Sequence, residues 1–160
     1  MVVALALGVG GWFATTQFTG AEMAPNVAYT LLDGRRTDLA ALRGKVVLVN
    51  FWATSCTVCV HEMPRIAALH EKFKSRGYDT LAVAMRYDPP ASVIRFAESR
   101  HLPFGVVIDN TGAVARGFGS VELTPTSVLI NKRGQIVERF VGEPDFEALH
   151  ALVERLLAEG

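Results

Sequence analysis

The sequence predicts an α/β domain in which helices flank a central mixed β-sheet. Three patterns predict it: an apolar run at residues 45–51, apolar positions at intervals of three or four after residue 59, and a hairpin before a final amphipathic helix. A continuous apolar run is typical of a strand covered on both faces. The 160 residues, half of them hydrophobic and a fifth charged, suffice for one such domain.

The predicted elements follow the order β-hairpin, β-α-β-α-β-α-β-β-α. Strands are expected at residues 27–32, 37–42, 45–51, 80–85, 104–108, 126–130 and 135–141. Helices are expected from residue 59 to Gly77, with Pro64 inside, and at 91–100, 111–118 and 145–157. Glycine-containing turns at 33–34 and 132–134 close the two hairpins.

The N-terminal segment differs from the rest in composition. Residues 1–21 carry no charged side chain, and residues 2–18 are apolar apart from three polar residues at 15–17. A membrane span needs about 20 apolar residues, and the core of a signal peptide about 7–15. We expect residues 1–23 to be a signal anchor, with a cleaved signal peptide as the alternative, and residues 24–160 to be the folded domain.

The charge balance excludes one class of partner. Lys plus Arg and Asp plus Glu each number 16, so the formal net charge is zero. Binding of nucleic acid or another polyanion relies on a basic surface. We therefore expect no nucleic-acid partner.

The two cysteines lie in one tetrapeptide, Cys56-Thr57-Val58-Cys59, directly after the predicted central strand. A disulfide across so short a loop removes little entropy from the unfolded chain, so it is a poor structural staple. The N-terminus of the following helix stabilises a thiolate through free N–H groups and the helix dipole. We expect Cys56 to be the exposed nucleophile. Cys59, one turn later and against the sheet, is expected to resolve the mixed disulfide.

Other uses of a paired cysteine motif fit less well. A structural zinc site needs four ligands, and the four histidines of the chain are scattered without a second pair. Attachment of c-type haem needs a histidine directly after the second cysteine, where this chain has Val60. We expect no metal and no cofactor. The alternatives that stay open are a copper-binding or redox-inert partner domain that uses the same thiols and, less favoured, a peroxidase.

Four further segments match a known family: Asp33-Gly34, residues 39–53, Glu62-Met63-Pro64 and Thr124-Pro125-Thr126. With them, the chain from Pro25 onward resembles the TlpA-like branch of the thioredoxin superfamily. These are membrane-anchored periplasmic thiol–disulfide oxidoreductases that include the cytochrome c maturation reductants. Thr57-Val58 departs from the family, because many relatives have proline before the second cysteine, and this bears on the redox potential.

The resemblance implies a thioredoxin fold with an extra αβ insertion at residues 87–101, and it implies roles for several residues. The spacing of Glu62 from Cys59 fits either a surface carboxylate or a buried acid that exchanges a proton with Cys59, and the resemblance favours the acid. Pro125 is implied to follow a cis bond, which leaves the Thr124 backbone free to pair with a substrate. An aromatic residue such as Trp52 usually lies in the core, but here Trp52 is expected to form one wall of the substrate site beside Cys56.

The resemblance also implies partners and a location. Substrates would be exported proteins with thiols or disulfides, such as apocytochrome c. Electrons would come from a membrane thiol reductase. The domain would lie in the periplasm or another extracytoplasmic space, anchored to the inner membrane by its N-terminus. The expected activity is thiol–disulfide exchange, with this protein as the reductant.

Overall fold

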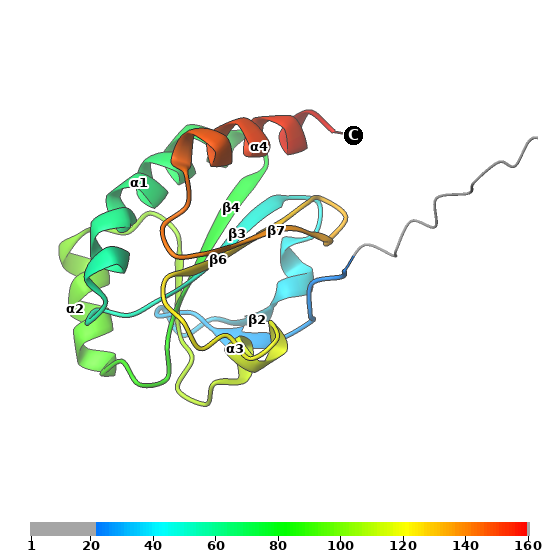
Figure 1. The fold of residues 1–160 in the computed structure, drawn as a ribbon. Helices are drawn as coiled ribbons and strands as arrows, with labels where there is room; N and C mark the ends of the chain where they lie inside the picture. Colours follow the sequence, from blue (N-terminus) through cyan, green and yellow to red (C-terminus); the bar gives the residue numbers. More distant parts are fainter. Residues whose placement is uncertain (1–21, 160) are drawn as a thin grey trace, which may run out of the picture.

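A computed structural model describes residues 22–159, which form a five-stranded mixed sheet with helices on both faces (Figure 1). The sheet strands are β3 (Val46–Trp52), β4 (Tyr78–Ala84), β5 (Gly105–Ile108), β6 (Thr126–Ile130) and β7 (Ile136–Val141). The helices are α1 (Thr57–Phe73), α2 (Pro90–Ser99), α3 (Ala113–Gly117) and α4 (Phe146–Ala158), with short 3-10 helices η1 (Leu39–Leu42) and η2 (Lys74–Arg76). A separate hairpin joins β1 (Ala28–Thr30) to β2 (Arg36–Asp38).

The strand order is β5-β4-β3-β6-β7, with β3, β4 and β5 parallel and β6 and β7 antiparallel to their neighbours. The mixed sheet, the helices and the N-terminal hairpin confirm the predicted fold class. The predicted insertion forms α2, which leads into the edge strand β5. In Figure 1, α1 and α4 run along one face of the sheet, while α3 and the β1–β2 hairpin lie on the other.

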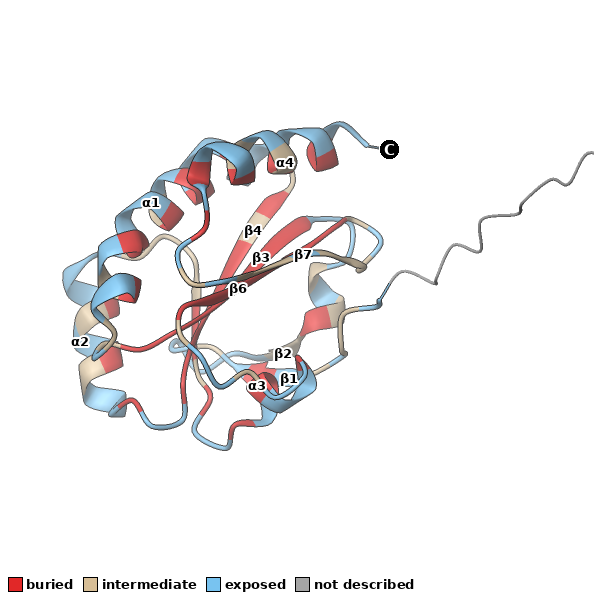
Figure 2. Cartoon of the chain, viewed as in Figure 1, coloured by how far each residue is buried: buried red, intermediate tan, exposed pale blue. Residues whose placement is uncertain are grey.

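The central strand β3 is buried along its whole length, as its apolar sequence predicts. Alternate residues point to opposite faces of a strand. Val47, Val49 and Phe51 therefore pack with the hairpin, η1 and α3, whereas Val46, Leu48 and Trp52 face the side of α1 and α4. Figure 2 shows the buried residues concentrated in the central strands and on the helix sides that face them.

Three loops meet at one end of this sheet. Phe51 pairs with Thr126, so the end of β3 adjoins the beginning of β6. Trp52 pairs with Ala84, so the loop after β4 begins at the same end. The cysteine loop, the Thr124-Pro125 loop and the β4–α2 loop are therefore neighbours, although they are far apart in sequence.

Residues 39–42 depart from the expected strand and form η1. The Asp38 carboxylate accepts a hydrogen bond from the Ala41 N–H (3.2 Å), and this cap starts a turn where the apolar pattern suggested a strand. The second predicted strand therefore ends at Asp38.

The described chain already contacts the domain before residue 24. Met23 bridges to Gln135, and the Ile136 N–H donates to the Glu22 carbonyl (2.8 Å). The predicted segment 1–23 otherwise lies outside the described residues. Within residues 22–159, no helix has the length and apolarity to cross a membrane.

Candidate active site

Cys56 and Cys59 form a disulfide at the N-terminus of α1, with their Cα atoms 5.3 Å apart. Cys56 is the N-cap of the helix, and its Sγ accepts a hydrogen bond from the Cys59 N–H (3.2 Å). The same N–H would stabilise a thiolate on Cys56 after reduction. Cys56 is half-buried and Cys59 has no exposed surface. Cys56 is thus the more accessible sulfur, in line with its predicted role as the attacking thiol.

Glu62 lies one turn after Cys59 and is completely buried. Its Oε1 accepts a hydrogen bond from Asn50 Nδ2 (3.0 Å), on the face of β3 that α1 covers. Asn50 Nδ2 also donates to Ser127 Oγ on β6 (3.0 Å). The alternative of a surface carboxylate is therefore wrong, because three adjacent elements enclose this side chain.

The burial of Glu62 raises its pKa to about 7, chiefly because the carboxylate loses its hydration and secondly because Glu143 is nearby. The hydrogen bond from Asn50 and the charge of Arg65 act in the opposite direction. Glu62 Oε2 has no hydrogen-bond partner within the described part of the chain. A buried carboxyl group with this pKa exchanges protons readily near neutral pH.

The Thr124–Pro125 bond is cis, as predicted. Pro125 is buried, and its carbonyl accepts a hydrogen bond from the Gly142 N–H (2.8 Å). Thr124 is half-buried, and among residues 22–159 its backbone N–H and C=O have no hydrogen-bond partner. These two free groups lie at the sheet end that carries the cysteines, where an extended peptide could bond to them.

Comparisons with known proteins agree on the type of site. The family model described as Redoxin matches residues 19–153. The chain is 37% identical to the thiol-disulfide oxidoreductase ResA of Bacillus cereus over 133 residues, which cover 83% of this chain and 76% of that protein. The ResA of Halalkalibacterium halodurans is 33% identical over 162 residues, which cover 99% of this chain and 91% of that protein. 

The chain belongs to the Redoxin family.

Solved structures agree with this assignment. A protein from Neisseria meningitidis described as a thioredoxin is 40% identical, has a TM-score of 0.79, and aligns over 85% of this chain and 90% of its own. A protein from Chlorobium tepidum described as the thiol:disulfide interchange protein DsbE is 29% identical, with a TM-score of 0.79 and coverage of 86% and 97%. This redoxin is a thiol–disulfide oxidoreductase of the TlpA-like branch, and Cys56 and Cys59 are its redox pair.

Trp52 does not line the substrate site beside Cys56, as the resemblance implied. Its side chain has no exposed surface and packs against Phe96, with the ring centroids 5.1 Å apart. It belongs to the buried cluster that includes Cys59 and, at its border, Cys56. Trp52 is the last residue of β3, and its side chain points to the α1 side. It packs in the core next to the cysteines, and in this redoxin's disulfide state it has no surface that a substrate could contact.

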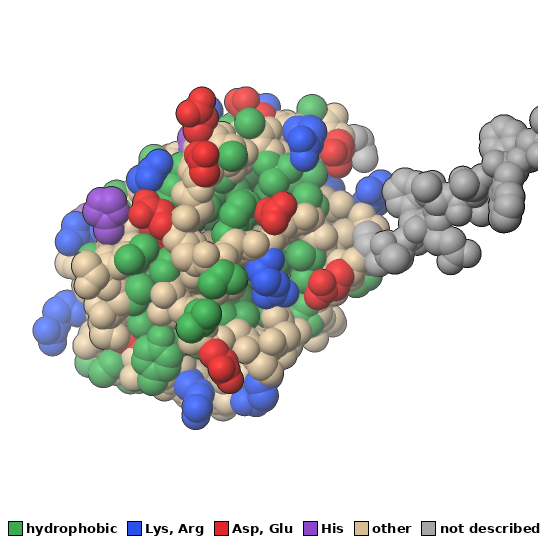
Figure 3. All heavy atoms as spheres, viewed as in Figure 1, with side chains coloured by type: hydrophobic (Ala, Val, Ile, Leu, Met, Phe, Trp, Pro, Cys, Tyr) green, Lys and Arg blue, Asp and Glu red, His purple; other side chains and the backbone are tan. Residues whose placement is uncertain are grey.

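Exposed apolar side chains surround the cysteine end of this redoxin. Val58, Tyr87 and Leu123 are exposed by 45%, 55% and 66%, and they come from α1, the β4–α2 loop and the loop before Pro125. The charged side chains in Figure 3 are of both signs and are interspersed among apolar and neutral ones. The end of the domain that carries the cysteines thus presents apolar side chains without a large surface of one charge.

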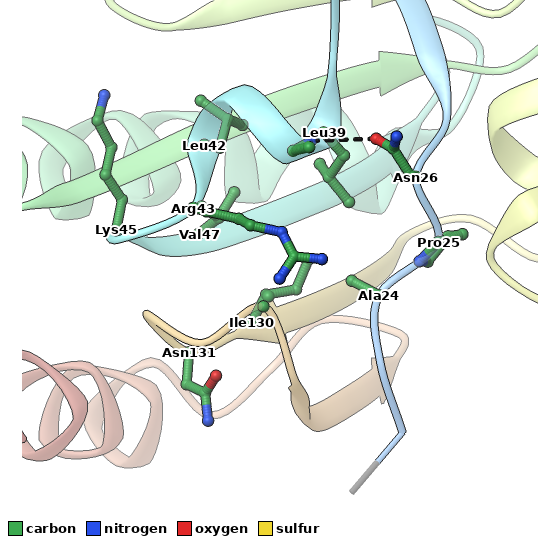
Figure 4. A pocket seen from close by; sticks show the side chains of 12 residues that line it. Ala24, Pro25, Asn26, Leu39, Leu42, Arg43, Lys45, Val47, Ile130 and Asn131 are labelled. Carbon is green, nitrogen blue, oxygen red and sulfur yellow. Dashed lines mark hydrogen bonds between the residues drawn. The ribbon is translucent and has the colours of Figure 1, made fainter.

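Two hollows of the surface formed by residues 22–159 lie away from the cysteines. An open pocket of about 20 Å³ is lined by residues 24–26, η1, the start of β3 and the end of β6 (Figure 4). Within it, the Ala40 N–H donates to Asn26 Oδ1 (3.3 Å). A groove of about 1080 Å³ extends beside the start of β4 and the edge strand β5. Both lie away from the end of β3 that carries the cysteines.

Sequence reasoning missed two residues of this site. Asn50 is a polar residue within the apolar run of β3, and this interruption was a usable signal that its side chain has a buried partner. Asp88 belongs to no motif in the sequence and lies between the strand expected at residues 80–85 and the helix expected at 91–100. It is buried, and its carboxylate holds Thr54 in the loop before Cys56.

Proposed function

We propose that this redoxin is a reductant of exported proteins, in which the Cys56 thiolate attacks a substrate disulfide and Cys59 displaces the reduced product. The observation that carries the proposal is the arrangement around the pair: one accessible sulfur at a helix N-terminus, and one buried sulfur a turn away from a buried acid with a pKa of about 7. Such an acid, Glu62, suits the buried Cys59, which must lose its proton before it attacks.

The resemblance to the cytochrome c maturation reductants supports the direction of electron flow. It rests on residues 39–53 and on Glu62-Met63-Pro64. We infer that the substrates are exported proteins with CxxC disulfides, such as apocytochrome c, and that a membrane thiol reductase supplies the electrons. Thr124 and Pro125 would hold an extended substrate segment beside Cys56.

The reduction potential of the Cys56–Cys59 couple tests this direction. We expect a value nearer to about −270 mV, as for thioredoxin, than to about −120 mV, as for a strong oxidant. The measurement is redox equilibration against glutathione and thioredoxin, followed by mass spectrometry of alkylated thiols. A separate assay measures whether the reduced protein reduces an oxidised peptide with a CxxCH segment, which serves as the trial substrate. A potential near −120 mV would reverse the proposed direction of electron flow.

We infer that residues 1–23 export the domain and anchor it to the membrane. Support comes from the uncharged, apolar sequence of residues 1–21. In membrane fractionation, the full chain should sediment with membranes, and a chain that begins at Glu22 should stay in the supernatant and keep its disulfide reductase activity. Equal distribution of the two chains would contradict the anchor.

A further inference from the structure

Asp88 is an unusual residue for the loop between β4 and α2. Its side chain is only 1% exposed, and it has no ion-pair partner within the described residues. Its oxygens accept two hydrogen bonds from Thr54, one from the backbone N–H (2.6 Å) and one from Oγ1 (2.5 Å). Burying a carboxylate is costly unless hydrogen bonds replace its hydration, and these two bonds bring together residues 34 positions apart.

Thr54 lies in the turn that delivers the nucleophile. The Cys56 N–H donates to the Ala53 carbonyl (3.1 Å), which closes a tight turn around Thr54 and Ser55. No other hydrogen bond joins residues 53–55 to a different element in the part of the chain that the structure describes. Asp88 is thus the polar link between this turn and the rest of the domain.

The same loop also contacts the other side of the site. Tyr87 OH lies 3.2 Å from Thr124 Oγ1, next to Pro125. The loop itself is fixed to the sheet, because the Met85 N–H donates to the Trp52 carbonyl (2.9 Å) and the Asp88 N–H to the Met85 carbonyl (2.9 Å). A firmly held loop therefore touches both segments between which a substrate disulfide would enter.

We propose that Asp88 is a positioning residue that keeps Cys56 Sγ at the N-terminus of α1 by holding Thr54. The helix can stabilise a thiolate only while the sulfur stays near the Cys59 N–H, now 3.2 Å away. The disulfide fixes this position in the oxidised protein. After reduction the sulfur is free of Cys59, and the turn that Asp88 holds must keep it in place. The inference rests on the proposed role of Cys56 as the attacking thiol.

Three variants test this, and each is reduced before its Cys56 thiol is alkylated with iodoacetamide over a range of pH. Asp88→Ala removes both hydrogen bonds, Thr54→Val removes the Oγ1 bond alone, and Asp88→Asn removes the charge but keeps an acceptor. In Asp88→Ala we expect the midpoint of the pH dependence of Cys56 alkylation to rise by about one unit, and the alkylation rate at pH 7 to fall by up to about tenfold. Thr54→Val should show a smaller loss, and Asp88→Asn should keep most of the wild-type rate.

Asp109 provides a matched control at the same end of the sheet. It is 3% exposed, and its carboxylate accepts hydrogen bonds from the Val114 and Ala115 N–H groups (3.1 and 2.8 Å), so it holds α3 and not the cysteine turn. Asp109→Ala should lower the melting temperature, as Asp88→Ala should, but leave the pH midpoint of Cys56 alkylation unchanged.

Rapid kinetics with a disulfide substrate should show that Asp88→Ala slows formation of the mixed disulfide and not its resolution.

Each other outcome overturns the inference in its own way. Faster alkylation in both Asp88→Ala and Asp88→Asn would mean that Asp88 acts by its negative charge and not by position. An unchanged pH midpoint in Asp88→Ala, despite lower thermal stability, would leave Asp88 with a structural role only. Mass spectrometry identifies which cysteine is alkylated. If Cys59 were alkylated faster than Cys56 in the wild-type protein, the proposed order of attack would be refuted, whatever the Asp88 variants do.

Discussion

Cys56→Ser should abolish disulfide reductase activity, whereas Cys59→Ser should accumulate a covalent mixed disulfide with its substrate. Cys56 is half-buried at the helix N-cap, and Cys59 has no exposed surface. Only a thiolate that a substrate can reach starts the exchange. We therefore expect the rate of substrate reduction to fall at least about a hundredfold in Cys56→Ser. In Cys59→Ser the first attack continues, but no second thiol releases the product.

The two serine variants are matched controls for each other, because each loses the same disulfide and gains the same hydroxyl group. Non-reducing electrophoresis after mixing with an oxidised substrate should show the trapped adduct with Cys59→Ser alone. Adducts of equal amount with both variants would show that either sulfur can attack first. Adducts with Cys56→Ser only would invert the two roles.

Glu62→Gln should slow the resolution of the mixed disulfide by about 10²-fold and leave the first attack by Cys56 nearly unchanged. Cys59 is buried, so its thiolate is costly to form and needs a base when it attacks. Glu62 is one helical turn away and has a pKa of about 7, and its Oε2 has no hydrogen-bond partner among residues 22–159. Glutamine keeps the shape and can still accept the hydrogen bond from Asn50 Nδ2, but it cannot take the proton.

Stopped-flow kinetics with a disulfide substrate separates the two steps. Glu71→Gln is a suitable control, because Glu71 lies on the same helix but is exposed and pairs with Lys74 (2.7 Å). Equal slowing of both steps by Glu62→Gln would indicate a general loss of structure. An unchanged rate of resolution would remove Glu62 from the mechanism.

The stability of the oxidised protein gives an independent check on Glu62. An acid whose pKa is higher in the folded state binds more protons when folded, between its unfolded and folded pKa values. The free energy of unfolding should therefore fall as the pH rises from about 4.5 to about 7, relative to Glu62→Gln. The difference between these pKa values corresponds to a loss of stability of about 3 kcal/mol at most. The loss is complete above pH 7 and absent below pH 4.5. Denaturant unfolding at pH 4 and pH 8 measures it, and a pH-independent difference would contradict the raised pKa.

Much of this site could be predicted from local sequence. The apolar run of β3 and the helical periodicity after Cys59 place the cysteine pair at the junction of a strand and a helix. The spacing of three residues places Glu62 on the same side of α1 as Cys59. These are properties of neighbouring residues, which strand and helix geometry fix directly.

Two expectations were wrong, one because distant elements pack together and one because a local side chain caps the backbone. The resemblance implied that Trp52 lines the substrate site beside Cys56, but its side chain faces α1 and packs on Phe96 of α2. Residues 39–42 have the apolar content of a strand, yet the Asp38 side chain caps them as a 3-10 helix. In both cases, a tertiary contact or a side-chain hydrogen bond outweighed the local pattern.

The sequence by itself determined the fold class, the redox pair and its place at a helix N-terminus, because periodicity and spacing act within one element. Only the tertiary structure decided what surrounds the pair. The register of β3 with β6 brings Asn50 and Ser127 together, and α1 places Glu62 against them. The parallel pairing of β3 with β4 brings Asp88 to Thr54. These partners are 12 to 77 residues apart, and hydrogen bonds at such separations form only after the sheet and helices have packed.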